Sequence, residues 1–327
     1  MRLVMMGTGT FAEPTFTALL RSGHPVVGLV TQPERAIGAQ RGSTRQVGEG
    51  MKEIALKHGV PVYQPERINT PEGVAQLKLW QADLLVVAAY GQILSPDVLA
   101  ATPHGGINVH ASLLPKYRGA APVAWAIYHG EAQSGVTIIQ MTPRLDAGGM
   151  IAQEAVPIGP DETAGELETR LAQIGAGLAL TSIAQLIAGT AKPLPQDQSQ
   201  ATKAPKLKKE DGQIDFRRTA PQVCTQIRAM QPWPTAYTFL HREGKEPVRL
   251  IVNRTAALPM PDIAGWEPPA GAVVQQSLKD LKLVVWTGGP GQVEILELQP
   301  AGKRRMAAAE FLRGLTLREG DRLGPEA

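Results

Sequence analysis

The chain has 327 residues, of which 43% are hydrophobic and 19% charged, and its formal net charge is +3. This composition excludes a disordered or fibrous chain and is typical of a globular protein of two domains, at ~150 residues per domain. A single cysteine, Cys224, excludes an internal disulfide framework and favours a reducing compartment.

The N-terminus enters a strand pattern directly, without the apolar segment and cleavage site of a signal peptide. The longest uninterrupted apolar run, residues 84–90, is too short to cross a bilayer. We therefore expect a cytoplasmic protein without membrane contact.

Strand and helix patterns alternate over the first half of the chain. The run "ADLLVVAAY" (82–90) is continuously apolar, which is typical of a strand in the buried middle of a parallel sheet. Helix patterns begin near Thr10, Gly50, Thr70 and Ser95. The expected strands are residues 2–8, 25–32, 60–65, 82–90, 106–111 and 135–141. This alternation predicts a doubly wound α/β domain built on a parallel sheet.

A second, smaller domain is expected after a long helix pattern at 162–189. Residues 190–206 are rich in Pro, Gln and Lys without apolar periodicity, which is typical of a linker. One helix pattern near 222–230 and several short strand patterns follow, separated by turns. They predict a small β-barrel. The expected domains are therefore residues 1–189 and 207–327, with 190–206 between them.

Two polar side chains stand at the end of one expected strand. Asn108 and His110 are two residues apart, so both point to the same face, at the sheet edge where doubly wound folds bind ligands. Asp146 follows the next strand in a glycine-flanked loop. A lone core histidine or turn aspartate is ordinary. Together on neighbouring strand ends, the three residues suit acyl transfer to a nitrogen nucleophile.

Other catalytic chemistries find less support in the sequence. Ser112 lacks the flanking glycines of a hydrolase nucleophile elbow. The histidines and Cys224 show no metal-ligand spacing, so we expect no metal. Direct transfer between two bound substrates is favoured.

The segments "NVHASLLPKYRGAAPVAWAI" and "GVTIIQMTPRLDAGGM" resemble the folate-dependent formyltransferase family. Further segments in the family's order, "YGQIL", "KLKKEDGQIDF", "IRAMQPWPTAY" and "LQPAGKRRM", extend the resemblance over nearly the whole chain, to members that act on initiator tRNA. The resemblance implies a Rossmann-like first domain and an OB-like barrel. It implies an enzyme of translation initiation that moves formyl from 10-formyltetrahydrofolate to the α-amine of initiator methionyl-tRNA. We expect the protein to be a monomer.

The resemblance also implies roles for individual residues. Asn108, His110 and Asp146 match the family's catalytic positions. The folate-contacting stretch corresponds to four consecutive residues, Ser112, Leu113, Leu114 and Pro115. For tRNA, the resemblance implies an inserted arginine and a set of basic contacts. The inserted residue is Arg41 or its competitor Arg45, and the basic contacts are Lys206, Lys208, Lys209, Lys303, Arg304 and Arg305.

The distribution of charge agrees with a polyanionic partner, because residues 1–202 carry 14 basic and 16 acidic side chains, whereas residues 203–327 carry 19 and 14. Basic segments of this kind are also common as solvated loops. Arg144 departs from the family pattern, which has glycine there, and adds a positive charge beside Asp146. The alternative function is a formyltransferase for a nucleotide-linked amino sugar, which needs the same three catalytic residues but neither the arginine loop at 33–48 nor the basic C-terminal motif.

Overall fold

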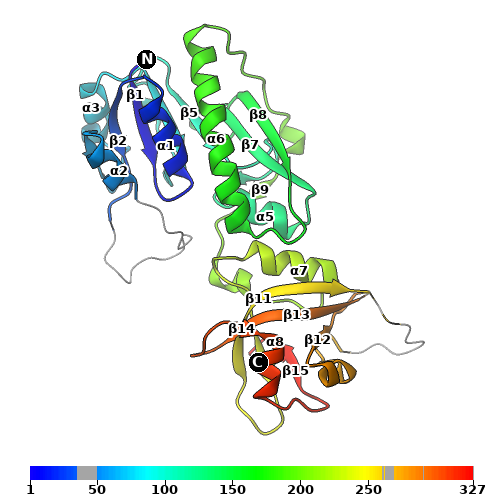
Figure 1. Ribbon diagram of the computed structural model, residues 1–327. Helices are drawn as coiled ribbons and strands as arrows, with labels where there is room; N and C mark the ends of the chain where they lie inside the picture. The colour runs from blue at the N-terminus through cyan, green and yellow to red at the C-terminus, as the bar shows by residue number, and fades with distance from the viewer. Residues whose placement is uncertain (35–49, 260, 262–268, 290, 327) are drawn as a thin grey trace. The chain divides into compact units, whose positions relative to one another are not determined.

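The fold is taken from a computed structural model that describes residues 1–34, 50–259, 261, 269–289 and 291–326 (Figure 1). The chain divides into two compact units. Unit 1 comprises Met1–Ala126, Ala132–Gly159 and Gly165–Lys206, and unit 2 comprises Ile127–Glu131, Pro160–Ala164 and Leu207–Ala327. The expected fold class, a Rossmann-like domain followed by a small barrel, is confirmed by the two sheets described below.

Unit 1 is built on a seven-stranded sheet in the order β3-β2-β1-β4-β5-β7-β8. Its parallel strands are β1 (Leu3–Gly7), β2 (Val26–Val30), β3 (Val62–Tyr63), β4 (Leu84–Ala88) and β5 (Gly106–His110). The last two, β7 (Gln133–Gln140) and β8 (Met150–Pro157), run antiparallel to their neighbours. The sheet is therefore mixed, where the sequence suggested a parallel one. An antiparallel pair needs no crossover helix, and the short loop at 141–149 joins β7 to β8.

The centre of this sheet explains where a ligand can bind. Every residue of β1 and β4 is buried, which is the reason for their continuous apolar sequences. The strand order reverses direction between β1 and β4, and such folds bind ligands beyond the carboxyl ends of the strands near this point. The strand β5 lies beside β4, so its C-terminal residues Asn108 and His110 reach the same edge.

Helices cover the sheet of unit 1 (Figure 1). They are α1 (Ala12–Arg21), α2 (Met51–Lys57), α3 (Pro71–Leu79), α4 (Pro96–Leu99) and α6 (Ala164–Ile187), while α5 (Pro122–Tyr128) spans the boundary with unit 2. Two of the expected helix starts are capped. The Thr70 side chain accepts a hydrogen bond from Gly73 N, and Ser95 does the same for Val98 N.

Residues 190–206 pair with the rest of unit 1, although their composition suggested a linker. Leu194 and Met150 exchange two backbone hydrogen bonds of 2.8 Å. Further along, β9 (Lys203–Ala204) pairs in parallel with β6 (Arg118–Gly119). A short 3₁₀ turn, η1 (Gln198–Gln200), lies between these two contacts. Pairing of this kind uses backbone groups alone and leaves no apolar period in the sequence to reveal it.

Unit 2 contains an antiparallel sheet in the order β12-β13-β11-β10-β15, with β14 paired to β13. The strands are β10 (Tyr237–His241), β11 (Val248–Leu258), β12 (Leu283–Trp286), β13 (Gln292–Pro300), β14 (Met306–Ala307) and β15 (Arg322–Gly324). Ala272 bridges to Arg322 and Val273 to Val285, so this short segment links the two edge strands and nearly closes a barrel. The run "GAVVQQ" (271–276) is one of the short strand patterns of the sequence, and its strand pairing is limited to these two bridges.

The remaining elements of unit 2 are helical: η2 (Lys209–Gly212), α7 (Ala220–Ala229), η3 (Gln275–Asp280) and α8 (Ala308–Arg313). Helix α7 starts with a reciprocal pair in which Thr219 N donates to the Gln222 side chain. Cys224 lies on this helix, and burial raises the pKa of its thiol. This supports a structural role for the cysteine, since a reactive thiol needs a lowered pKa.

The long helix α6 is apolar enough to cross a membrane by length and composition, with a mean hydropathy of 1.2 over its most apolar window. The core helix of a soluble protein has the same character. Here Leu167, Leu171 and Ile183 of α6 are completely buried, so these three residues belong to the core of unit 1.

The helix α6 also carries a largely buried acidic side chain, that of Glu168. Glu168 lines a cavity of about 830 Å³ between α1 and α6, together with apolar residues such as Phe11, Ala172 and Ala176. Burial raises the pKa of Glu168 to about 7, because the charged carboxylate loses hydration there.

This raised pKa predicts that unit 1 loses stability as the pH rises from about 4.5 to about 7. The folded pKa lies above the unfolded one, so the stabilisation is complete below the unfolded pKa and is lost through the folded pKa. Glu168→Gln should therefore raise the urea midpoint at pH 8 and leave it unchanged near pH 4.5. The expected gain is about 1 kcal/mol, less than the full shift implies, because Glu168 stays partly exposed. Glu66→Gln, at an exposed site, should change neither midpoint. Equal effects of Glu168→Gln at both pH values would contradict the burial argument.

Candidate active site

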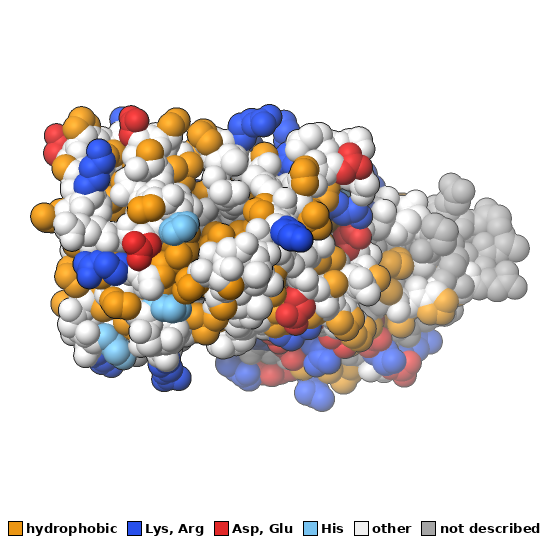
Figure 2. Space-filling model, turned by 90° about the horizontal axis from the view of Figure 1, so that it is seen from above, with side chains coloured by type: hydrophobic (Ala, Val, Ile, Leu, Met, Phe, Trp, Pro, Cys, Tyr) orange, Lys and Arg blue, Asp and Glu red, His pale blue; other side chains and the backbone are white. Residues whose placement is uncertain are grey.

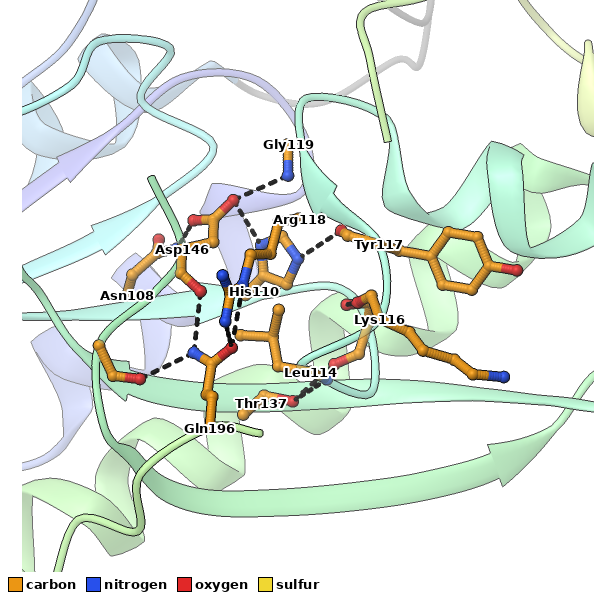
Figure 3. A network of polar contacts seen from close by, with 12 residues as sticks. Asn108, His110, Leu114, Lys116, Tyr117, Arg118, Gly119, Thr137, Asp146 and Gln196 are labelled. Atoms are coloured by element: carbon orange, nitrogen blue, oxygen red, sulfur yellow. Dashed lines mark hydrogen bonds and ion pairs between the residues drawn. The ribbon is translucent and has the colours of Figure 1, made fainter. Parts of the chain in front are cut away.

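Three polar side chains meet at the carboxyl end of β5 (Figure 3). Asn108 and His110 alternate along β5 with the buried Ile107 and Val109, and Asp146 comes from the loop between β7 and β8. The His110 Nδ1 atom lies 3.6 Å from Asp146 Oδ2, and Asn108 Nδ2 lies 3.5 Å from Asp146 Oδ1. The structure therefore brings together the three residues that the sequence singled out.

The surroundings of His110 fix which of its nitrogens can change protonation. Its side chain is 5% exposed, and Nε2 lies 3.0 Å from the carbonyl oxygen of Tyr117. A carbonyl can only accept a hydrogen bond, so Nε2 carries a hydrogen. The Nδ1 atom, which faces Asp146, is then the position that gains or loses a proton.

A backbone N–H group holds the side chain of Asp146 in place. Its Oδ2 atom accepts a hydrogen bond of 2.9 Å from Gly119 N. Gly119 has φ +129°, and a Cβ there would collide with the carbonyl of Ala204. Glycine is therefore required for this N–H to reach the carboxylate. Asp146 itself has φ +48°, an uncommon left-handed conformation that its neighbours must stabilise.

The loop after β5, residues 112–115, is held by its own hydrogen bonds. Ser112 Oγ donates to the carbonyl of Lys116, and Leu114 N donates to Thr137 Oγ1. Thr137 Oγ1 in turn donates to the carbonyl of Ser112 at 2.6 Å. Ser112 and Leu114 are thus buried and engaged in the loop, while Leu113 and Pro115 remain partly exposed. Of the four residues expected to contact folate, these two can offer side-chain surface.

Gln196 is a member of the site that the sequence did not indicate. Its Nε2 atom donates to the carbonyls of Asp146 and Gly148, at 2.8 and 2.7 Å. Its Oε1 atom accepts from Arg118 Nε and Nη2, at 3.0 and 2.6 Å. The sequence around Gln196 is polar and shows neither apolar periodicity nor a recognisable motif, so the sequence does not indicate a functional role for this residue.

The basic residues expected to bind tRNA lie on the surface in two places. Lys206 ends unit 1, and Lys208 and Lys209 begin unit 2; all three are exposed. Lys303, Arg304 and Arg305 are exposed between β13 and β14.

Arg304 pairs with Glu310 and Arg305 with Glu297, so part of their charge is neutralised within unit 2. On the face shown in Figure 2, basic and acidic side chains are interspersed. Arg41 and Arg45 lie outside the described residues.

Two further expectations concern charge and metal at the site. Arg144 is exposed two residues before Asp146, where it adds a positive charge to the rim. Within the described ranges, no group of three or more His, Cys, Asp or Glu side chains could hold a metal ion. Catalysis without a metal stays a prediction.

Comparison with known proteins identifies the family. A family model described as formyl transferase matches residues 1–183, and one described as formyl transferase, C-terminal domain, matches 206–316. A methionyl-tRNA formyltransferase of Symbiobacterium thermophilum is 44% identical over 99% of this chain and 96% of its own length. One from Bacillus subtilis is 38% identical over 99% of this chain and 98% of its own length.

A more distant likeness bears on the fold alone. The N-formyltransferase of Helicobacter canadensis, solved in complex with folinic acid and dTDP-3-aminofucose, superposes with a TM-score of 0.65 at 18% identity, covering 90% of this chain and 98% of that one. At this identity the likeness does not support the amino-sugar alternative, whereas the relatives at 38% and 44% identity over 99% of this chain are named for methionyl-tRNA. The chain belongs to the formyl transferase family and, within it, to the methionyl-tRNA formyltransferases.

Proposed function

We propose that the protein transfers the formyl group of 10-formyltetrahydrofolate to the α-amine of methionine on initiator methionyl-tRNA. The observation that carries this proposal is the convergence of Asn108, His110 and Asp146 at the end of β5. The full-length similarity to enzymes named for methionyl-tRNA supports the acceptor. We also propose that the enzyme acts as a cytoplasmic monomer.

The reaction joins the attacking nitrogen to the formyl carbon and then releases the folate nitrogen. Attack by the neutral amine gives a tetrahedral species whose former carbonyl oxygen is negative. The Asn108 amide and a protonated His110 Nδ1 are the donors that stabilise this oxygen. The bond from the formyl carbon to N10 of the folate then breaks, and the leaving nitrogen takes up the proton that the amine gives up.

Asp146 has two tasks in this scheme. Its carboxylate lies 3.6 Å from Nδ1 of His110, where it orients the imidazole ring. In this scheme it also accepts the amine proton and passes it toward the leaving nitrogen. The hydrogen bond from Gly119 N holds the carboxylate in place for both tasks.

For the donor, we propose that residues 112–115 form one wall of the folate site. Leu113 and Pro115 present their partly exposed side chains, and Ser112 and Leu114 keep the loop rigid through Lys116 and Thr137. For tRNA, we propose phosphate contacts by the six exposed basic residues named above, and insertion of Arg41 or Arg45 at the acceptor end.

Alanine at Asn108, His110 or Asp146 should each lower the transfer rate by at least ~100-fold, the usual scale for a general acid–base group or an oxyanion donor. The affinity for tRNA should change little. The triple variant should be far less impaired than the product of the three single effects, because the groups act on one transition state. Single-turnover rates at saturating substrates measure this, with Ser199→Ala, at an exposed site, as the control. A near wild-type rate in any of the three variants would remove that residue from the mechanism.

Replacing Lys303, Arg304 and Arg305 together by alanine should weaken the binding of all tRNAs alike. Contacts to phosphate do not depend on the base sequence of the RNA, so all tRNAs should be affected equally. Fewer phosphate contacts release fewer counterions, so affinity should depend less steeply on salt. Glu310→Gln is the matched control, because it frees Arg304 from its ion pair and should not weaken binding. Filter binding of initiator and elongator tRNA at two salt concentrations tests this. Affinity that does not depend on salt would argue against tRNA as the acceptor.

Arg41→Ala should lower turnover on initiator tRNA more than it lowers general RNA affinity, if this residue places the methionyl amine at the acceptor end. Arg45→Ala, in the same part of the sequence, is the comparison that decides between the two arginines. Single-turnover rates and filter binding are measured for both variants. Unchanged turnover in both would exclude both arginines from placing the acceptor.

A further inference from the structure

We propose that Gln196 is a positioning residue that fixes the Asp146 loop in its reactive conformation, and that Arg118 fixes the orientation of Gln196. This inference rests on the proposed function, since it assigns the Asp146 carboxylate to catalysis. Figure 3 shows Gln196 between the Asp146 loop and Arg118. Gln196 is 7% exposed, and it comes from the segment that the sequence suggested as a linker.

Chemistry allows only one orientation of the Gln196 amide. The guanidinium of Arg118 has donors and no acceptor, so the atom of Gln196 that faces it must be the carbonyl oxygen. On the other side lie the carbonyls of Asp146 and Gly148, which can only accept. The NH₂ group therefore points to these carbonyls, and both of its hydrogens are used.

The two carbonyls that Gln196 holds lie on either side of Ala147, at the turn that carries Asp146. Asp146 adopts a left-handed backbone conformation that an aspartate does not favour by itself. At Gly148 a Cβ would collide with the carbonyl of Gln140, so the loop packs tightly against β7. Gln196 supplies side-chain donors to this turn, and through it sets where the carboxylate of Asp146 points.

Gln196 also joins the two loops that build the site. The chain before it pairs with Met150 through Leu194, and the chain after it pairs with β6 through β9. The strand β6 includes Gly119, whose N–H holds Asp146, and follows Tyr117, whose carbonyl holds His110. The contact between Gln196 and Arg118 therefore links the loop that carries Asp146 to residues 117–119, whose backbone holds both Asp146 and His110. Gln196 itself does not contact the Asp146 carboxylate or His110 in the hydrogen bonds described, so its role is indirect.

Gln196→Glu gives the sharpest test. A glutamate keeps the acceptor for Arg118 as an ion pair, but it places an oxygen against two carbonyl oxygens. We expect kcat to fall by roughly 100-fold, since displacement of a reacting group by 1 Å can cost this much. KM for the folate and for the tRNA should stay within about threefold. Repulsion between the new oxygen and the two buried carbonyls should lower the melting temperature, so kcat is measured well below it, where the variant is folded. Gln196→Ala should lower kcat by roughly 10- to 100-fold with KM similarly unchanged.

Gln200→Ala is the matched control, because Gln200 is exposed in the same segment and its side chain bonds Asp197 instead. It should leave kcat, KM and the melting temperature unchanged. A purely structural role for Gln196 would lower the melting temperature of both variants and leave kcat of the folded enzyme at the wild-type value. Wild-type kcat in Gln196→Glu would therefore overturn the inference.

The same assay separates this failure from that of the proposed function. If the wild-type enzyme transfers formyl to methionyl-tRNA and His110→Ala does not, the proposed function holds whatever the Gln196 variants do. If the wild-type enzyme shows no such transfer, the proposed function fails and the positioning role fails with it.

Discussion

The site depends on the placement of one carboxylate. Asp146 Oδ2 lies between Gly119 N and His110 Nδ1, and Asp146 Oδ1 faces Asn108. A carboxylate in a largely buried position must have partners, because an isolated charge there would lose its hydration without compensation. The groups around Asp146 provide this compensation, and they also hold the carboxylate next to Nδ1 of His110.

The mixed sheet of unit 1 makes this placement possible. The strand β5 is parallel to β4 and delivers Asn108 and His110 to the carboxyl edge, where a doubly wound sheet is open to ligands. The strand β7 runs antiparallel to β5, and its last residue, Gln140, pairs with Ile107 near the start of β5. The C-terminal end of β7 therefore lies at the opposite edge of the sheet from His110. The loop from β7 to β8 carries Asp146 to the side chains of β5, and additional contacts hold it there.

Those contacts come from a segment with no regular structure of its own beyond the two residues of β9 and the turn η1. Residues 190–206 belong to unit 1 by their pairing, and they contribute the buried amide of Gln196.

The basic residues proposed to bind tRNA also take part in contacts within the protein. Arg304 and Arg305 have carboxylate partners inside unit 2, so a phosphate that binds them must compete with an existing ion pair.

The sequence by itself determined the fold class and the identity of the central residues. Continuous apolar runs identified the buried strands, and the spacing of Asn108 and His110 placed both on one face, since side chains alternate along a strand. The capping residues Thr70 and Ser95 marked helix starts, because the side chain that caps a helix is local to it. Each of these features is set by neighbours in the chain, which is why pattern reasoning reached them.

Tertiary structure decided what depends on groups distant in sequence. The antiparallel direction of β7, the pairing of Leu194 with Met150 and the orientation of Gln196 rest on hydrogen bonds between remote segments. Backbone hydrogen bonds of this kind are available to any residue but proline, so they leave no mark on composition or periodicity. The requirement for glycine at residue 119 is of the same kind, since it follows from the approach of Ala204, which lies far along the chain.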